Sequence, residues 1–194
     1  MKMNKTFIAM ALIGMTAGSV QAASEAQAIA SWKATATKDS TDQALVVTPL
    51  GSLEFQYAPG IKGFNTVSGM FDIAIKGNAG TVEDPITGFT LKAKKINGTL
   101  SNATGDANVE VGVQWQGQSI AKDAYTTLID TKAGVNGAGL SAVGAGFKSD
   151  ASAQSSFNFN VTSATNNGAA VALDALPDGQ YQGNVDVEFV ANWA

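Results

Sequence analysis

The sequence predicts an all-β fold, a sandwich or barrel of short antiparallel strands. From Leu45 onward, apolar residues recur at every second position in segments of strand length, which is the period of a half-buried strand. Turn-forming pairs such as Gly77-Asn78 and Asn136-Gly137 separate these segments. The 194-residue chain contains no Cys, so we expect packing and backbone pairing alone to stabilise the fold.

The N-terminus has the form of a cleaved secretory signal peptide. Lys2 and Lys5 precede the apolar stretch FIAMALIGMTAG, which is too short to span a bilayer, and Val20-Gln21-Ala22 fits a small-residue cleavage site. We therefore expect residues 1–22 to be removed during export. An uncleaved anchor is the alternative, but no apolar stop-transfer run follows.

The next stretch, EAQAIASWKATAT, has apolar residues at alternate positions but no evident partner. An extended strand would place six of them on one face: Ala26, Ala28, Ala30, Trp32, Ala34 and Ala36. Ile29 lies in the other set, and the following TKDSTDQ contains neither Gly nor Pro to turn the strand back. A helix is the competing interpretation, because Ala is the best helix former and Ser24 with Gln27 forms a candidate capping box.

Seven further segments are the candidate strands of the folded domain. In chain order they are LVVT, SLEFQYA, GMFDIAIK, GFTLKAK, NVEVGVQWQ, SFNFNV and GQYQGNVDVEFVANW. Their alternating residues define apolar faces, for example Phe71 with Ile73, Val111 with Val113, and Phe157 with Phe159. The Gly/Ala/Ser-rich region 133–156 is predicted to be a surface connection with little structure of its own.

The last of these segments predicts one long strand that reaches the end of the chain. Its alternating residues are Tyr181, Gly183, Val185, Val187, Phe189, Ala191 and Trp193. Nothing follows Ala194 to cover the next position of the sheet. The sequence thus predicts an orphan strand near its start and an open sheet edge at its end.

The residue types that are absent exclude most enzyme chemistry. The chain has no His and no Cys, and all twelve of its basic residues are Lys. A Ser-His-Asp or Cys-His nucleophile, a His or Cys zinc site and guanidinium recognition of phosphate are therefore excluded. Loop carboxylates such as Glu83 and Asp130 lack ligand-like spacing, so we expect no catalytic residue, metal site or cofactor.

Net charge and aromatic residues limit the classes of molecule that the protein could bind. The formal net charge is −4 at pH 7, and loss of Lys2 and Lys5 with the signal makes the mature chain more acidic, which argues against nucleic acid. Trp115, Trp193 and Tyr181 could stack on sugars, but their register with the apolar faces favours packing. An exported, monomeric carbohydrate-binding sandwich is the alternative function at this point.

Four stretches together resemble the major pilins, or fimbrillins, of the bacterial common pilus. They are AQAIASWKATATKDS, VVTPLGSLEFQYAPGIKGF, GMFDIAI and LPDGQYQGNVDVEFVANW. More distantly, the chain is similar to the alpha-class fimbrial subunits assembled by an alternate chaperone-usher pathway. The resemblance covers essentially the whole mature chain and is closest at its two ends.

The resemblance implies an immunoglobulin-like β-sandwich that lacks its last strand and receives it from a neighbouring subunit. The implied organisation is a signal peptide at 1–22, a donor-strand extension at 23–37 and a pilin sandwich at 38–194. The implied donor residues are Ala26, Ala28, Ile29, Ala30, Trp32, Ala34 and Ala36. The implied acceptor groove and chaperone edge comprise Tyr181, Val185, Val187, Phe189, Ala191, Trp193 and Ala194.

The resemblance also implies partners and a location. The partners are copies of the same chain in a fibre, a periplasmic chaperone, an outer-membrane usher, a tip adhesin and a host-cell receptor. The expected function is that of a structural, non-enzymatic major subunit of a surface pilus used in adhesion and biofilm formation. We expect the subunit to pass through the periplasm to the fimbrium at the cell surface.

Overall fold

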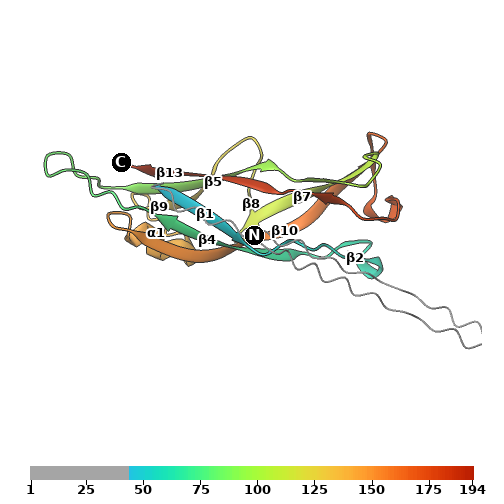
Figure 1. Cartoon of the computed structure of the whole chain (residues 1–194), viewed down its shortest axis with the longest axis horizontal. Helices are drawn as coiled ribbons and strands as arrows, with labels where there is room; N and C mark the ends of the chain where they lie inside the picture. The colour runs from blue at the N-terminus through green and yellow to red at the C-terminus, as the bar shows by residue number, and fades with distance from the viewer. Residues whose placement is uncertain (1–43) are drawn as a thin grey trace, which may run out of the picture. The chain divides into compact units, whose positions relative to one another are not determined.

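The computed structural model describes residues 44–194, which fold into two packed antiparallel sheets (Figure 1). The larger sheet has the order β1 (Leu45–Leu50), β4 (Val67–Ile75), β10 (Ala151–Asn166), β7 (Ala107–Trp115), β6 (Thr99–Ser101) and β12 (Gln182–Gly183). Two short strands extend it: β11 (Ala169–Val171) on β10 and β8 (Gln118–Ser119) on β7. The smaller sheet has the order β13 (Asp186–Trp193), β5 (Phe89–Asn97) and β9 (Thr126–Asp130). The predicted all-β fold is confirmed.

Three short helical turns and a hairpin complete these elements. The hairpin joins β2 (Tyr57–Ala58) to β3 (Gly63–Phe64) through the 3-10 turn η1 (Pro59–Ile61). The others are η2 (Ala138–Leu140), α1 (Ser141–Ala145) and η3 (Leu173–Ala175). Among residues 44–194, no helix is long and apolar enough to cross a membrane.

The core lies between the apolar faces of the two sheets. Strand pairing places Ile73 opposite Ala153 and Val113 opposite Phe159, so these side chains point to the same face of the larger sheet. From the smaller sheet, Phe89 and Leu91 meet them and are fully buried. The apolar faces predicted for the strands at 71–75, 109–115 and 157–161 are therefore confirmed.

The Gly/Ala/Ser-rich region 133–156 belongs to the folded core, so the prediction of a surface connection is wrong. It closes one side of the sandwich, between β9 and β10, and buries Leu140 and Val143 completely. Gly137 adopts a positive φ of 72°, and a Cβ there would lie 2.5 Å from Ile129 Cγ1 of β9. Small residues thus allow the close approach, and their composition concealed it. We call β9 and residues 137–147, which contain η2, α1 and Phe147, the closed flank.

A two-stranded ribbon crosses from one sheet to the other. At Gly98 the chain passes from β5 in the smaller sheet to β6 in the larger, and at Asn184-Val185 it passes from β12 back to β13. The single long strand predicted for residues 179–193 is therefore wrong, because it is divided between two sheets. The Asn97 side-chain amide donates to the Asn184 carbonyl at 3.0 Å and ties the two crossings together.

An ion pair between a buried lysine and a partly exposed glutamate supports this crossing. Lys95 is 8% exposed, and its Nζ donates to Glu110 Oε1 at 2.6 Å and to the Val111 carbonyl at 3.0 Å. Burial raises the pKa of Glu110, but hydrogen bonds from Lys95 and Thr99 outweigh it, so its pKa lies below its ordinary value. The pair links β5 to β7 where the ribbon changes sheet.

Candidate functional site: an open flank

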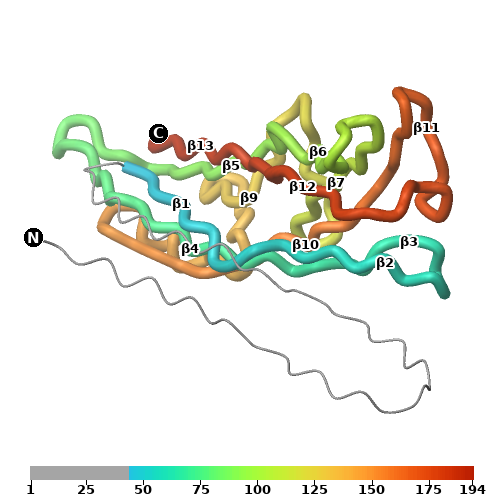
Figure 2. The backbone as a smooth tube through the Cα atoms, turned by 45° about the vertical axis from the view of Figure 1, so that its right-hand side comes forward, coloured from blue at the N-terminus to red at the C-terminus, as the bar shows by residue number. Residues whose placement is uncertain are grey.

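On the side opposite the closed flank, two strands end their sheets without a further partner. Among the described residues, β1 pairs only with β4, and β13 pairs only with β5. The blue β1 and the red β13 mark these two edges in Figure 2. Each edge therefore leaves a row of backbone groups available for another strand.

The chain between β1 and β2 lengthens the unpaired edge. Residues 51–56 have the alternation of a strand, but no strand of the described chain pairs with them, and only Tyr57–Ala58 of the predicted SLEFQYA is a strand. The alternation still directs Leu53 inward, where a Cβ added to Gly69 would lie 2.9 Å from Leu53 Cδ2. At its end, Gln56 accepts from the Asn65 N–H at 3.0 Å and donates to Asn65 Oδ1 at 2.6 Å. Residues 51–55 are thus strand-like in their side-chain pattern and pair with no strand of the described chain. We call β1, residues 51–56, residues 180–185 and β13 the open flank.

Apolar residues along the open flank pack inward but remain partly exposed. Phe189 packs against Phe71 and Phe157, with ring centroids 5.4 and 5.8 Å apart, and Trp193 packs edge-on to Phe89. The half-buried apolar residues of this flank that pack on the main core are Leu45, Val47, Leu53, Phe55, Val185, Val187, Phe189, Ala191 and Trp193. A continuous row of half-buried apolar side chains indicates a core that lacks its cover on this side.

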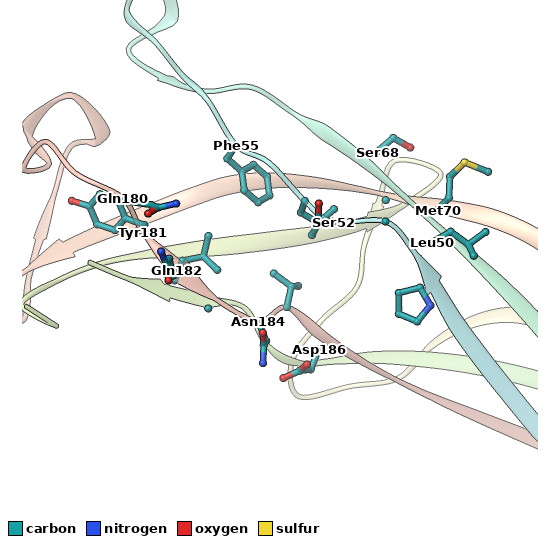
Figure 3. A pocket seen from close by; sticks show the side chains of 17 residues that line it. Leu50, Ser52, Phe55, Ser68, Met70, Gln180, Tyr181, Gln182, Asn184 and Asp186 are labelled. Carbon is teal, nitrogen blue, oxygen red and sulfur yellow. The ribbon is translucent and has the colours of Figure 1, made fainter. Parts of the chain in front are cut away.

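A cavity of about 520 Å³ lies between the two walls of the open flank (Figure 3). Leu53 and Phe55 contribute apolar side chains from one wall, and Tyr181 and Val185 contribute from the other. Amide side chains stand at the rim: Gln180, Gln182 and Asn184. A second cavity of about 410 Å³ shares Leu53, Phe55 and Tyr181 and reaches Phe64, Val109 and Val161 of a smaller apolar cluster. The two cavities form one groove.

The far end of β13 is tied down rather than open. The Trp193 indole N–H donates to the Phe147 carbonyl at 3.0 Å. The Ala194 N–H donates to Gly88, and the Ala194 carbonyl accepts from Gly88 at 2.6 Å and from Thr87 at 3.0 Å. These bonds extend the β13–β5 ladder to the last residue, and the cavity of about 520 Å³ lies at the other end of β13, beside Val185.

The outward face of β13 is held by a charged cluster. Glu188 lies opposite Lys94 of β5, with Nζ and Oε2 3.0 Å apart, and the Tyr125 hydroxyl donates to the same carboxylate at 2.9 Å. The hydrogen bonds from Lys94 and then Tyr125 lower the pKa of Glu188, and the bond to Glu188 raises the pKa of Lys94. The cluster holds β13 to its single neighbour without entering the groove.

The structure brings together most of the predicted groove residues. Val185, Val187, Phe189, Ala191 and Trp193 lie on one inward face, whereas Tyr181 packs on the smaller cluster and donates its hydroxyl to the Pro177 carbonyl at 2.9 Å. The packing role predicted for Trp115, Trp193 and Tyr181 is confirmed. The seven predicted donor residues, the signal peptide and the competing helix all lie outside the described residues.

Sequence reasoning missed the opposite wall of the groove. Leu45, Val47, Leu53 and Phe55 were recognised as strand residues but not as groove residues. The sequence pattern that could have identified them is the one that identified β13: alternating apolar residues in a segment that no turn connects to a partner strand. Among residues 44–194 there is no group of three or more acidic residues placed to hold a metal ion.

Comparison with known proteins identifies the family of this chain. The family model described as fimbrillin MatB matches residues 25–193. The chain belongs to the MatB fimbrillin family. Common pilus major fimbrillin subunit EcpA of Klebsiella pneumoniae (strain 342) is 45% identical over 201 residues, which cover 98% of this chain and 99% of the relative.

Other relatives extend the comparison. EcpA of Escherichia coli O1:K1 / APEC is 43% identical over 199 residues, covering 98% of this chain and 99% of the relative. The CooA pilin subunit of enterotoxigenic Escherichia coli has a TM-score of 0.45 and 17% identity, over 75% of this chain and 86% of that one. The resemblance to common pilus fimbrillins is confirmed. The fimbrillin relatives support a structural pilus subunit and do not favour a free carbohydrate-binding monomer.

Proposed function

We propose that this fimbrillin is the major subunit of an extracellular pilus and polymerises by donor-strand exchange. The extension at 23–37 of one copy occupies the open flank of the next and supplies the strand that the sandwich lacks. The observation that carries the proposal is the open flank itself, where two unpaired edges border a groove lined by half-buried apolar side chains.

The physical reason lies in backbone pairing. An inserted strand would hydrogen-bond to the free edge of β13 and cover the apolar row from Val185 to Trp193. Ladder bonds supply affinity whatever the side chains are, and small Ala side chains fit where the groove is narrow. The contact is heterologous and does not close on itself, so repeated contacts build a fibre.

Assembly then requires protection of the open flank before polymerisation. A half-buried apolar row beside two free edges is an aggregation hazard in a single subunit. A periplasmic chaperone covers β13 up to Ala194, an outer-membrane usher exchanges it for the next extension, and a tip adhesin ends the fibre. The assembled pilus serves adhesion to a host-cell receptor and biofilm formation.

The experiment that tests the proposal moves the extension from one end of the chain to the other. Deletion of residues 25–37 should yield a subunit that cannot polymerise. Appending these residues after Ala194 through a short Gly/Ser linker should yield a soluble monomer, because a strand that follows β13 can turn back into its own groove. Tethering raises the effective concentration of the strand to about the millimolar range.

Thermal unfolding by circular dichroism and size-exclusion chromatography provide the readouts. The appended form should unfold at a clearly higher temperature than the deletion, because a full ladder and its apolar contacts are regained. As a control, Trp32→Asp within the appended strand should remove much of the gain by placing an unpaired charge against apolar side chains. Equal thermal midpoints for the deleted and appended forms would refute donor-strand exchange.

A further inference from the structure

The cavity between Leu53 and Val185 is large compared with most side chains of the extension. Its volume is about 520 Å³, whereas five of the six alternating apolar residues in Glu25–Thr37 are Ala. The backbone of an inserted strand would occupy part of this space, but a row of methyl groups would add little more, and unfilled apolar space forfeits packing energy. A large side chain at this position would therefore add packing that Ala cannot.

Trp32 is the largest side chain that the extension offers. An indole ring buries about 150–250 Å² and requires an acceptor for its N–H when it leaves water. The cavity offers both: Leu53, Phe55 and Val185 line it with apolar side chains, and Gln180 and Gln182, which also line it, carry amide oxygens that can accept a hydrogen bond.

Charge decides which face of the extension turns inward. If the face of Ile29 entered the groove, Lys33 would enter with it, because residues four apart share one face of a strand. Its ammonium would then lie against apolar side chains such as Leu53, Phe55 and Val185, and the one acidic residue that lines this cavity, Asp186, is itself exposed to water. With the Trp32 face inward, Lys33 points to water.

Resting on the proposed donor-strand exchange, we propose that Trp32 of one copy fills the cavity between Leu53 and Val185 of the next. Trp32 then fixes both the face and the register of the inserted strand. The flanking Ala30 and Ala34 lie on the same inward face, on either side of Trp32. The partner is a second copy of this chain, and the specificity-determining residues are Trp32 and the walls of the cavity.

Cysteine cross-linking in assembled fibres tests this register. The chain has no Cys, so two introduced thiols are the only ones present. Trp32→Cys with Val185→Cys in the full-length chain should give a ladder of covalent multimers on non-reducing gels after oxidation. Opposed residues of paired strands lie about 4.5–5.5 Å apart, which a disulfide can span. The matched control is Lys33→Cys with Val185→Cys, which should give no ladder because residue 33 points outward.

A second set of variants retains Trp32, in case its loss prevents assembly. Val187 lies two residues from Val185 on the same face of the flank. Either Ala30→Cys or Ala34→Cys should therefore cross-link to Val187→Cys, according to the direction of the inserted strand. Lys33→Cys with Val187→Cys is again the matched control and should stay monomeric on the gel.

The outcomes separate this inference from the proposed function. Ladders from Ile29→Cys or Lys33→Cys with Val185→Cys, but not from Trp32→Cys, would overturn the Trp32 register and leave donor-strand exchange intact. Intact fibres with no ladder from any extension position to Val185→Cys or Val187→Cys would overturn both. Ladders from Trp32→Cys, or from Ala30→Cys or Ala34→Cys in the second set, with silent Lys33→Cys controls, are the result that we expect.

Discussion

The two flanks of the sandwich differ in how completely they cover the same core. On the closed flank, the chain itself turns back over β9 and β10, and Leu140 and Val143 have no exposed surface. On the open flank, Leu53 and Val185 face a cavity of about 520 Å³ and are half-buried. The difference lies in the source of the covering segment. The closed flank carries its own cover, and we infer that the open flank receives one from another subunit.

The largest expected effect contrasts one leucine on each flank. Leu140→Ala should cost about 2–5 kcal/mol of unfolding free energy, because it leaves a cavity in a fully packed region. This loss should be equal in the extension-deleted subunit and in the form with the strand appended after Ala194. Leu53→Ala should cost about 1 kcal/mol in the deleted form, where Leu53 is half-covered, and more in the appended form.

Urea unfolding of both forms measures these four losses. A Leu53→Ala loss that does not grow when the strand is appended would contradict the view that the open flank is covered on assembly. A Leu140→Ala loss that differs between the two forms would show that the closed flank is not independent of the open one.

The next largest expected effect is the loss of stability when a glycine with positive φ is replaced by Ala, compared between the two flanks. Gly137 on the closed flank has φ 72°, and a Cβ would meet Ile129 Cγ1 at 2.5 Å, whereas Gly51 on the open flank has φ 103° and no atom within 4 Å of that position. Gly137→Ala should therefore cost about 2–4 kcal/mol, from backbone strain and overpacking together. Gly51→Ala should cost only the backbone strain, about 1–2 kcal/mol.

Thermal midpoints of the two alanine variants provide the measurement, and Gly168→Ala is the control. Gly168 has φ 78° and open space around it, but it belongs to neither flank. It should behave like Gly51→Ala. A Gly51→Ala variant as unstable as Gly137→Ala would mean that the open flank is as tightly packed as the closed one.

The contrast between the flanks also explains what the sequence could predict. The strands around Ile73, Val111 and Phe159 were predictable because each buries one face, and alternation reports that burial directly. The apolar face of β13 was predictable for the same reason. The half-buried state of this face was not, because alternation is the same whether the covering strand is present or absent.

The wrong predictions concern segments in which the alternation of side chains does not match the pairing of the backbone. The closed flank reads as Gly, Ala and Ser, because it needs small residues for close approach, as at Gly137. Residues 51–56 read as a strand although no described strand pairs with them. The division of residues 179–193 between two sheets depends on the ribbon crossing beside Gly98, where a Cβ would lie 2.7 Å from the Val111 carbonyl, and no local pattern reports such a long-range contact.

A smaller effect concerns the ion pair at the ribbon crossing. The pKa of Glu110 lies below its ordinary value of 4.5, because the hydrogen bonds from Lys95 and Thr99 outweigh the opposing effect of burial. Its stabilisation is therefore fully present above the pKa of the unfolded chain and is lost as pH falls through the folded pKa. Glu110→Gln should cost about 1 kcal/mol at neutral pH, a modest amount because the carboxylate is partly exposed.

The dependence of the unfolding free energy on pH in the acid range tests the expected loss of the Glu110 contribution. Between about pH 5 and pH 3, the unfolding free energy of Glu110→Gln should fall less steeply than that of the parent chain. Denaturant midpoints across this range provide the measurement, with Asp150→Asn as the control at a loop carboxylate that accepts from Gly77. An unchanged slope in Glu110→Gln would show that the pair does not contribute to stability at the crossing.

The smallest effect tests whether the outward face of β13 matters to the open flank. Glu188 is held by Lys94 and Tyr125, and these hydrogen bonds lower its pKa, so its stabilising contribution is present at neutral pH and is lost as pH falls through the folded pKa. Glu188→Gln should lower the thermal midpoint slightly at low ionic strength and less at high ionic strength, because salt screens an exposed pair.

Glu83→Gln is the control, since Glu83 lies in an exposed loop between β4 and β5 and makes no ion pair among the described residues. Neither change should prevent fibre formation, because neither residue lines the groove and the ladder between β13 and β5 persists without them. Loss of fibres in Glu188→Gln, with the subunit still folded, would mean that the charged face of β13 takes part in assembly and that the open flank extends beyond its apolar row.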